Sequence, residues 1–77
     1  MTKRNVWLIC EGWGGQTEIS NIIPCATKAA AVRVLKESEY VRRKNLEKPN
    51  EDYEYWETKA GATFNRWAKL YKEKIIW

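Results

Sequence analysis

Few side chains in this chain could carry out a reaction, and they are mainly carboxylates and two thiols. The sequence contains no histidine, which is the residue that most often acts as a general acid or base near neutral pH. Cys10 and Cys25 could be nucleophiles, but no imidazole is present to activate either thiol. Glu11 lies between an apolar segment and a glycine-rich turn, where a carboxylate could be active, although polar residues commonly end a strand. We therefore expect a protein that is not an enzyme.

The same residue types argue against a bound cofactor or metal. Gly12, Gly14 and Gly15 surround Trp13, but their spacing matches neither the dinucleotide-binding nor the P-loop pattern, because residue 16 is glutamine and no lysine follows in register. These glycines indicate a hairpin turn. Two cysteines without a histidine cannot complete a four-ligand zinc site within the chain. We expect no cofactor and no metal.

Two basic stretches are the first candidates for binding. The chain has 14 Lys and Arg against 10 Asp and Glu, a net charge of +4, which permits a polyanionic partner without requiring one. Arg42, Arg43 and Lys44 lie near the expected end of a helix. Cations there complement the helix dipole, or they contact a phosphate or an acidic protein.

The second stretch interleaves cations with aromatic rings, as single-strand nucleic-acid surfaces do. If the segment is a strand, Trp67, Lys69 and Tyr71 project from one face. Alternatively, Trp67 and Tyr71 pack on a helix and the lysines fringe the core. The candidate nucleic-acid-binding residues are Arg66, Trp67, Lys69, Tyr71, Lys72 and Lys74.

Trp13 is the best single candidate for an exposed anchor in a protein interface. It is set between glycines at the tip of a turn, where its neighbours cannot easily bury it, and tryptophan is enriched at binding hot spots. The alternative is that its ring folds over Pro24 or the edge of a sheet.

An acidic run lies nearer the C-terminus. We expect it to form cross-strand ion pairs with Lys59, Arg66 and Lys69; its members are Glu51, Asp52, Glu54 and Glu57.

The elements that position these residues begin with a predicted hairpin over residues 4–13 and 16–24 that turns at Gly14-Gly15. Residue i then faces residue 29 − i, so that Cys10 faces Ile19 and Cys25 faces Arg4. The two sulfurs would lie roughly 20 Å apart at about 3.3 Å per residue, too far for a disulfide. We expect two free thiols.

A helix follows the hairpin. Thr27 is its expected N-cap, and apolar residues recur at helical spacing from residue 31 to residue 41. Because Lys48 precedes Pro49, the helix is expected to end by Glu47 or earlier. Residues 53–58 alternate aromatic and acidic side chains, which predicts a half-buried strand.

Residues 63–77 fit either a helix or a strand. Their local periodicity favours a helix, but the preceding aromatic strand needs a partner, and we therefore predict a second hairpin. The expected fold is a single small domain over residues 1–77 of the α+β class. It has an antiparallel sheet of two hairpins with one helix packed on one face, in the order β-β-α-β-β.

This order resembles that of short phage-encoded accessory proteins. The likeness rests on the N-terminal strand Val6-Trp7-Leu8-Ile9-Cys10-Glu11-Gly12, the helix beginning Thr27-Lys28-Ala29-Ala30-Ala31, and a closing pair of aromatic strands. The resemblance implies an origin in a virus or mobile element, whose small proteins commonly bind and inhibit host machinery.

We therefore expect a non-enzymatic protein-binding module that inhibits a host protein or nucleoprotein, for example a CRISPR-type defence complex. A small basic nucleic-acid-binding protein is the alternative. No run of about 18 apolar residues exists, so no membrane partner is expected, and the expected location is the cytoplasm of the host cell. The exposed sheet face or a free edge could also bind a second copy of the chain.

Overall fold

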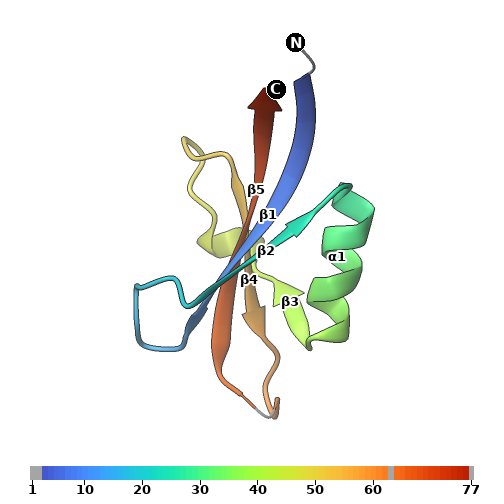
Figure 1. The fold of residues 1–77 in the computed structure, drawn as a ribbon. Helices are drawn as coiled ribbons and strands as arrows, with labels where there is room; N and C mark the ends of the chain where they lie inside the picture. Colours follow the sequence, from blue (N-terminus) through green and yellow to red (C-terminus); the bar gives the residue numbers. More distant parts are fainter. Residues whose placement is uncertain (1–2, 63, 77) are drawn as a thin grey trace.

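The computed structural model describes residues 3–62 and 64–76 and shows one antiparallel sheet with a helix on one side (Figure 1). Thr63 and Trp77, which the last predicted strand included, lie outside the described residues. The elements are β1 (Lys3–Trp13), β2 (Asn21–Cys25), α1 (Lys28–Glu37), β3 (Tyr40–Arg42), the short 3₁₀ helix η1 (Lys44–Leu46), β4 (Tyr53–Thr58) and β5 (Arg66–Ile76).

The two longest strands lie at the centre of the sheet, whose order is β2-β1-β5-β4-β3. β1 pairs with β5 along its whole length, from Lys3 opposite Ile76 to Trp13 opposite Arg66. The predicted α+β class, antiparallel sheet, single helix and final strand are thus confirmed. The β-β-α-β-β layout was incomplete, because the short strand β3 joins the edge of the sheet beside β4.

The first hairpin has a different register from the one predicted. Trp7 lies opposite Cys25 and Glu11 opposite Asn21, so that residues 14–20 form a wide loop instead of a tight turn. The loop is held away from the ladder because Trp67 donates its indole N–H to the Gln16 carbonyl at 2.8 Å. A ring packed beneath the loop prevents those residues from continuing the strand pairing.

The prediction of two free thiols is confirmed, and both are buried. The predicted facing residues are wrong, since Cys10 lies opposite Ile22 and Cys25 opposite Trp7. Side chains alternate between the faces of a sheet. Cys25 belongs to the core beneath the helix, and Cys10, whose partner in β5 is Lys69, lies on the opposite face. The sheet itself therefore separates the two sulfurs.

The helix begins where it was predicted and ends much earlier. The Thr27 hydroxyl accepts a hydrogen bond from the Ala30 N–H at 3.1 Å, which caps the first turn. The helix ends at Glu37 instead of near Glu47, because Glu39 has a positive φ of 67° and reverses the chain into β3. A left-handed residue at this position is a common helix stop, although glycine or asparagine is the usual signal.

The core fills the space between α1 and one face of the sheet. Ile9, Leu35 and Leu70 are fully buried there. Glu11 of β1 is a buried charged residue, with 5% of its surface exposed. Its carboxylate pairs with the Arg66 guanidinium at 2.8 Å and accepts a hydrogen bond from the Tyr40 hydroxyl at 3.1 Å. Glu11, Tyr40 and Arg66 thus join β1, β3 and β5, and Glu11 has a structural role.

Candidate functional site: the open face of the sheet

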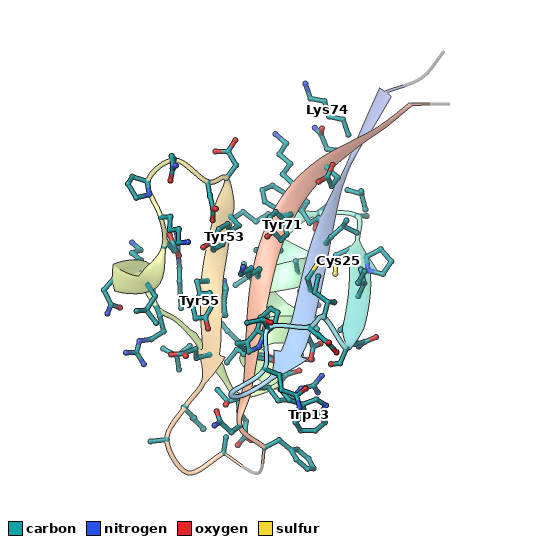
Figure 2. The ribbon with its side chains drawn as sticks, turned by 90° about the vertical axis from the view of Figure 1, so that its left-hand side faces the viewer. Trp13, Cys25, Tyr53, Tyr55, Tyr71 and Lys74 are labelled. Carbon is teal, nitrogen blue, oxygen red and sulfur yellow. The ribbon has the colours of Figure 1, made fainter. Side chains whose placement is uncertain are left out.

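The sheet has two unlike faces, and α1 lies against only one of them. In β1, Trp7 and Ile9 contact the core beneath the helix, so Leu8 and Cys10 project from the opposite face. Figure 2 looks onto this second face, with Tyr53, Tyr55 and Tyr71 in front of the strands and the helix behind them. Within residues 3–62 and 64–76, no helix of this chain packs over it.

Aromatic side chains from β4 and β5 gather on the open face. Tyr53 lies opposite Tyr71, and Tyr55 lies opposite Lys69. Trp67 precedes Lys69 by two residues on β5 and therefore shares its face. The rings of Tyr53 and Tyr71 have centroids 5.6 Å apart. The Lys69 ammonium lies 4.9 Å from the centroid of the Tyr53 ring and 5.8 Å from that of Trp67. We call Tyr53, Tyr55, Trp67, Lys69 and Tyr71 the aromatic face.

The phenols and the thiol of this surface are uncharged at neutral pH. Burial raises the pKa of Tyr55 and Tyr71 above the ordinary value, and neighbouring acidic groups add to the effect. Burial likewise raises the pKa of the Cys10 thiol, partly opposed by the Lys69 ammonium. A thiol of this kind is a poor nucleophile. The surface therefore offers aromatic contact area and one central cation, with no activated group.

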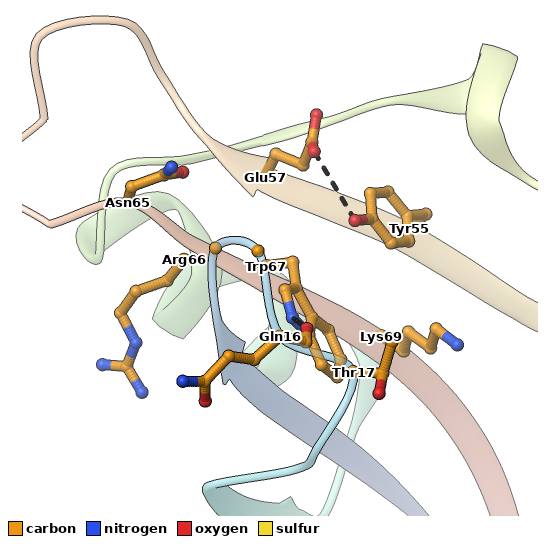
Figure 3. A pocket seen from close by; sticks show the side chains of 10 residues that line it. Gln16, Thr17, Tyr55, Glu57, Asn65, Arg66, Trp67 and Lys69 are labelled. Carbon is orange, nitrogen blue, oxygen red and sulfur yellow. Dashed lines mark hydrogen bonds between the residues drawn. The ribbon is translucent and has the colours of Figure 1, made fainter.

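A pocket of about 430 Å³ lies at one end of the aromatic face (Figure 3). The loop over Gln16 and Thr17 forms one wall, and Tyr55 and Glu57 of β4 form another. The Trp67 ring is held against Gly12, where any Cβ would collide with the indole. The smallest residue is thus needed at position 12 for close packing, and the pocket has a rigid aromatic side.

The structure separates the six candidate nucleic-acid-binding residues between the two faces. Trp67, Lys69 and Tyr71 share the open face, as predicted for a strand. Arg66, Lys72 and Lys74 alternate with them and belong to the face that α1 partly covers. Arg66 is already paired with Glu11. Among the six residues, Lys69 is therefore the cation that lies beside the rings of the aromatic face.

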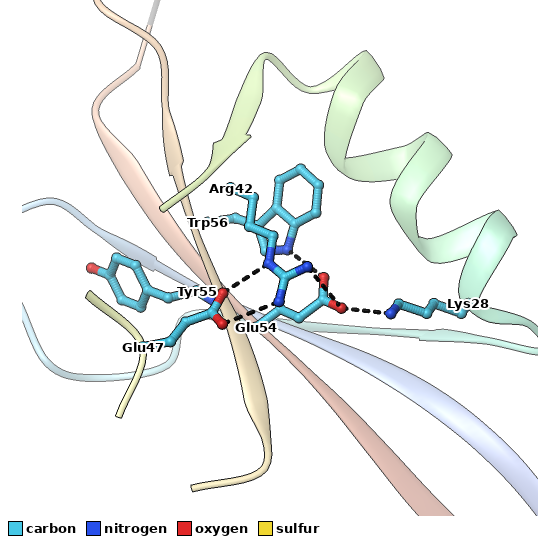
Figure 4. Close-up of polar contacts among 6 residues, drawn as sticks. All are labelled: Lys28, Arg42, Glu47, Glu54, Tyr55 and Trp56. Atoms are coloured by element: carbon cyan, nitrogen blue, oxygen red, sulfur yellow. Dashed lines mark hydrogen bonds and ion pairs between the residues drawn. The ribbon is translucent and has the colours of Figure 1, made fainter. Parts of the chain in front are cut away.

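The predicted cluster of Arg42, Arg43 and Lys44 does not lie at a helix terminus, because α1 ends at Glu37. Arg42 forms two hydrogen bonds with the Glu47 carboxylate, at 2.9 and 3.1 Å, in a network drawn in Figure 4. This pairing is the main reason that the pKa of Glu47 lies below its ordinary value. Arg43 pairs with Glu57 at 3.4 Å, and Lys44 is exposed in η1. Two of the three cations are thus already neutralised.

The predicted partners of the acidic run are wrong. Glu54 pairs with Lys28 at 2.7 Å and lies 3.6 Å from Arg42, and Glu57 pairs with Arg43. These cations come from α1 and the β3 region, instead of from the neighbouring turn and β5. The ion pairs differ from the prediction because β3 lies beside β4 at the edge of the sheet. In the predicted fold no strand occupied that edge.

Trp13 lies at the end of β1, outside the aromatic face. It is 43% exposed, and its ring meets that of Phe64, which is 57% exposed, edge to face at a centroid distance of 5.8 Å. The Arg66 guanidinium lies 4.9 Å from the centre of the Trp13 ring. Pro24 pairs with Leu8, far from Trp13 along the ladder. Trp13 and Phe64 form a second, smaller exposed aromatic group, which we call the tip.

Tyr53 and Tyr55 were not among the predicted site residues. The alternation Tyr53-Glu54-Tyr55 was a signal that both tyrosines share a face. The sequence did not show which face of this strand the helix would cover. The two tyrosines were as plausible as partners for the helix as Trp56, which is the residue that enters the core. Only the pairing of β4 with β5 places these tyrosines beside Lys69 and Tyr71.

Comparisons with known proteins give no match to a protein-family model, to a curated protein or to a solved structure. The described part of the chain contains no helix with the length and apolar character needed to cross a bilayer. Among the same residues, no group of acidic, cysteine or histidine side chains is arranged to hold a metal ion.

Proposed function

We propose that the chain is a non-enzymatic protein-binding module and that the aromatic face is its binding surface. The observation that carries this proposal is the unequal cover of the sheet. α1 packs on one side, whereas half-buried tyrosines occupy the other side, which among the described residues is covered at one end by the loop over Gln16 and Thr17 and by no helix. Tyrosine and tryptophan provide large contact areas at low cost in side-chain entropy and are enriched in protein interfaces.

The charges of the open face favour a protein over a nucleic acid. Among the side chains that the structure describes, Lys69 shares this face with Glu57 and Glu73. Arg43 pairs with one of these two carboxylates. A phosphate backbone would meet too few cations here, since affinity for nucleic acid depends on several Lys or Arg contacts. The matching surface is an apolar protein patch with a carboxylate opposite Lys69.

The resemblance to small phage-encoded accessory proteins bears on the identity of the partner. It supports a host protein or nucleoprotein in the cytoplasm, which the chain would inhibit by covering a working surface. An anti-CRISPR-type inhibitor is one example of this mode of action. Inhibition by occlusion needs no catalytic group, which agrees with the raised pKa of the Cys10 thiol and the lack of histidine.

The test is capture of a partner by the tagged full chain from bacterial lysate, with two matched variants. Tyr55→Thr/Tyr71→Thr removes two rings from the aromatic face and retains β-forming residues. Trp13→Thr/Phe64→Thr removes the two rings of the tip. We expect the first variant to lose the captured protein at least tenfold and the second to retain it. Loss with the tip variant alone would overturn the assignment of the surface.

Sedimentation of the chain alone separates a host partner from a second copy. The proposal predicts a monomer at micromolar concentration. A dimer that the Tyr55→Thr/Tyr71→Thr variant dissociates would show that the face is an interface between copies, and the proposal of a host partner at this face would then be wrong.

A further inference from the structure

Lys69 is a half-buried cation held between aromatic rings. Its ammonium lies 4.9 Å from the centroid of the Tyr53 ring and 5.8 Å from that of Trp67. Among the side chains that the structure describes, no carboxylate forms an ion pair with it. Rings attract an ammonium group only weakly at a partly exposed site. A carboxylate brought to Lys69 would therefore meet a cation that has already lost part of its water.

The acidic side chains around Lys69 do not occupy this position. Glu57 lines the same pocket as Lys69, but its carboxylate lies 3.4 Å from the Arg43 guanidinium and accepts a hydrogen bond from the Tyr55 hydroxyl at 3.5 Å. In Figure 3 the Lys69 side chain points away from Glu57. The exposed carboxylates that line a second hollow beside Lys69 are those of Glu51, Asp52 and Glu73.

The pocket of Figure 3 opens beside Lys69 and is large enough for one aromatic side chain. Its volume of about 430 Å³ lies near the lower end of the range of about 300–1,000 Å³ for ligand sites. Trp67 belongs to its lining, and Tyr55 and the loop over Gln16 bound it on two sides. The Trp67 indole N–H donates to the Gln16 carbonyl at 2.8 Å, which fixes the ring. The aromatic lining is therefore in place before any partner binds.

We propose that this pocket receives an aromatic side chain of the protein partner, and that an aspartate or glutamate two residues further along the partner pairs with Lys69. Trp67 and Lys69 are two residues apart on β5, so they share a face at a spacing of about 6.6 Å. An extended partner segment lying along β5 has the same repeat, which places its residues i and i+2 at the pocket and at the ammonium. A partner ring would gain aromatic contacts with Tyr55 and Trp67.

This inference rests on the proposed function, because it specifies what the aromatic face recognises. The probes are three capped tripeptides, acetyl-Phe-Ser-Asp-amide, acetyl-Phe-Ser-Asn-amide and acetyl-Ala-Ser-Asp-amide, added to the isotope-labelled full chain. The reporter is the NMR signal of the Trp67 indole N–H, which lies at the pocket.

We expect the first peptide to shift the Trp67 signal in a saturable manner. The asparagine peptide, which lacks only the charge, should bind about fivefold more weakly. The alanine peptide, which lacks the ring, should bind at least about tenfold more weakly. Raising the salt concentration should reduce the difference between the aspartate and asparagine peptides, since it screens the ion pair.

Lys69→Gln and Lys72→Gln form a matched pair of variants. Both remove one positive charge from β5, but Lys72 alternates onto the face that α1 partly covers. We expect Lys69→Gln to bind the aspartate and asparagine peptides equally, and Lys72→Gln to retain the difference between them. In bacterial lysate, Lys69→Gln should capture at least about threefold less partner, and Lys72→Gln should capture the same amount as the unaltered chain. Circular dichroism of each variant verifies that the sheet is formed.

Three results would overturn the inference. The first is an unshifted Trp67 signal at about 20 mM of the aspartate peptide. The second is equal affinity of the unaltered chain for the aspartate and asparagine peptides. The third is tighter binding of acetyl-phenylalanine, which would assign the pocket to the carboxyl terminus of a chain. Failure of the proposed function would look different, because the Tyr55→Thr/Tyr71→Thr variant would then still capture the partner.

Discussion

Replacing Glu11 with glutamine tests the buried network that joins three strands of the sheet. The carboxylate is 5% exposed and contacts the Arg66 guanidinium at 2.8 Å and the Tyr40 hydroxyl at 3.1 Å. Breaking a fully buried ion pair costs about 3–5 kcal/mol. The Arg66 side chain is 26% exposed, so water partly replaces its lost partner, and we reduce the expected cost to about 2–3 kcal/mol.

Such a loss is large for a domain of 77 residues, whose expected stability is about 4–12 kcal/mol. At about 4–8 °C per kcal/mol, the midpoint of thermal unfolding should fall by roughly 10–20 °C. The assay is urea and thermal unfolding followed by circular dichroism. Tyr40→Phe removes only the neutral donor and should cost about 1 kcal/mol.

Glu73→Gln is the control, because it neutralises an exposed carboxylate and should change stability by less than about 0.5 kcal/mol. The double variant Glu11→Gln/Tyr40→Phe should be less destabilised than the sum of the single changes, since the first change weakens and the second removes the same hydrogen bond between residues 11 and 40. If Glu11→Gln proved no more destabilising than Glu73→Gln, the account of Glu11 as a structural anchor would be wrong.

Three further predictions follow from particular contacts. Glu47→Gln should cost about 1–2 kcal/mol at pH 7 through its charged hydrogen bonds. The folded state lowers the pKa of Glu47. Its contribution to the free energy of unfolding is therefore fully present above the unfolded pKa of about 4.3 and is lost as the pH falls below that value, through the lowered folded pKa. A difference in stability between Glu47→Gln and the unaltered chain that does not change with pH would contradict the assignment. Gly12→Ala should displace the Trp67 ring and cost about 1–3 kcal/mol, visible in chemical denaturation and as a shift in tryptophan emission, whereas unchanged emission would refute the packing. Cys10 and Cys25 should react with a thiol reagent only in denaturant, and an intramolecular disulfide in the oxidised protein would contradict their placement on opposite faces.

The sequence predicted the elements better than their pairing. Apolar and aromatic strands at residues 4–13 and 53–58 were clear because their composition is typical of strands, and Thr27 marked the start of the helix. The final strand was ambiguous by periodicity and was correctly assigned because the aromatic strand required a partner. The end of the helix was missed because Tyr40 and Val41 also fit the helical spacing, and nothing local shows that Tyr40 reaches Glu11 across the sheet.

The surfaces were harder to predict because they depend on long-range register. Alternation placed Trp67, Lys69 and Tyr71 together, but only the pairing of β4 with β5 adds Tyr53 and Tyr55. The network around Glu47 was equally hidden, since it depends on the edge strand β3, which brings Arg42 beside β4.

Site-specific photo-crosslinking tests the central claim most directly. A photoreactive aromatic amino acid would replace Tyr55 on the aromatic face, Phe64 at the tip or Arg33 on α1, one position at a time, and each tagged chain would be irradiated in bacterial lysate. The account predicts a discrete covalent adduct with one host protein from position 55, competed by the unlabelled chain, and none from position 33. A specific adduct from position 64 or 33 without one from position 55 would contradict the claim that the aromatic face is the binding surface.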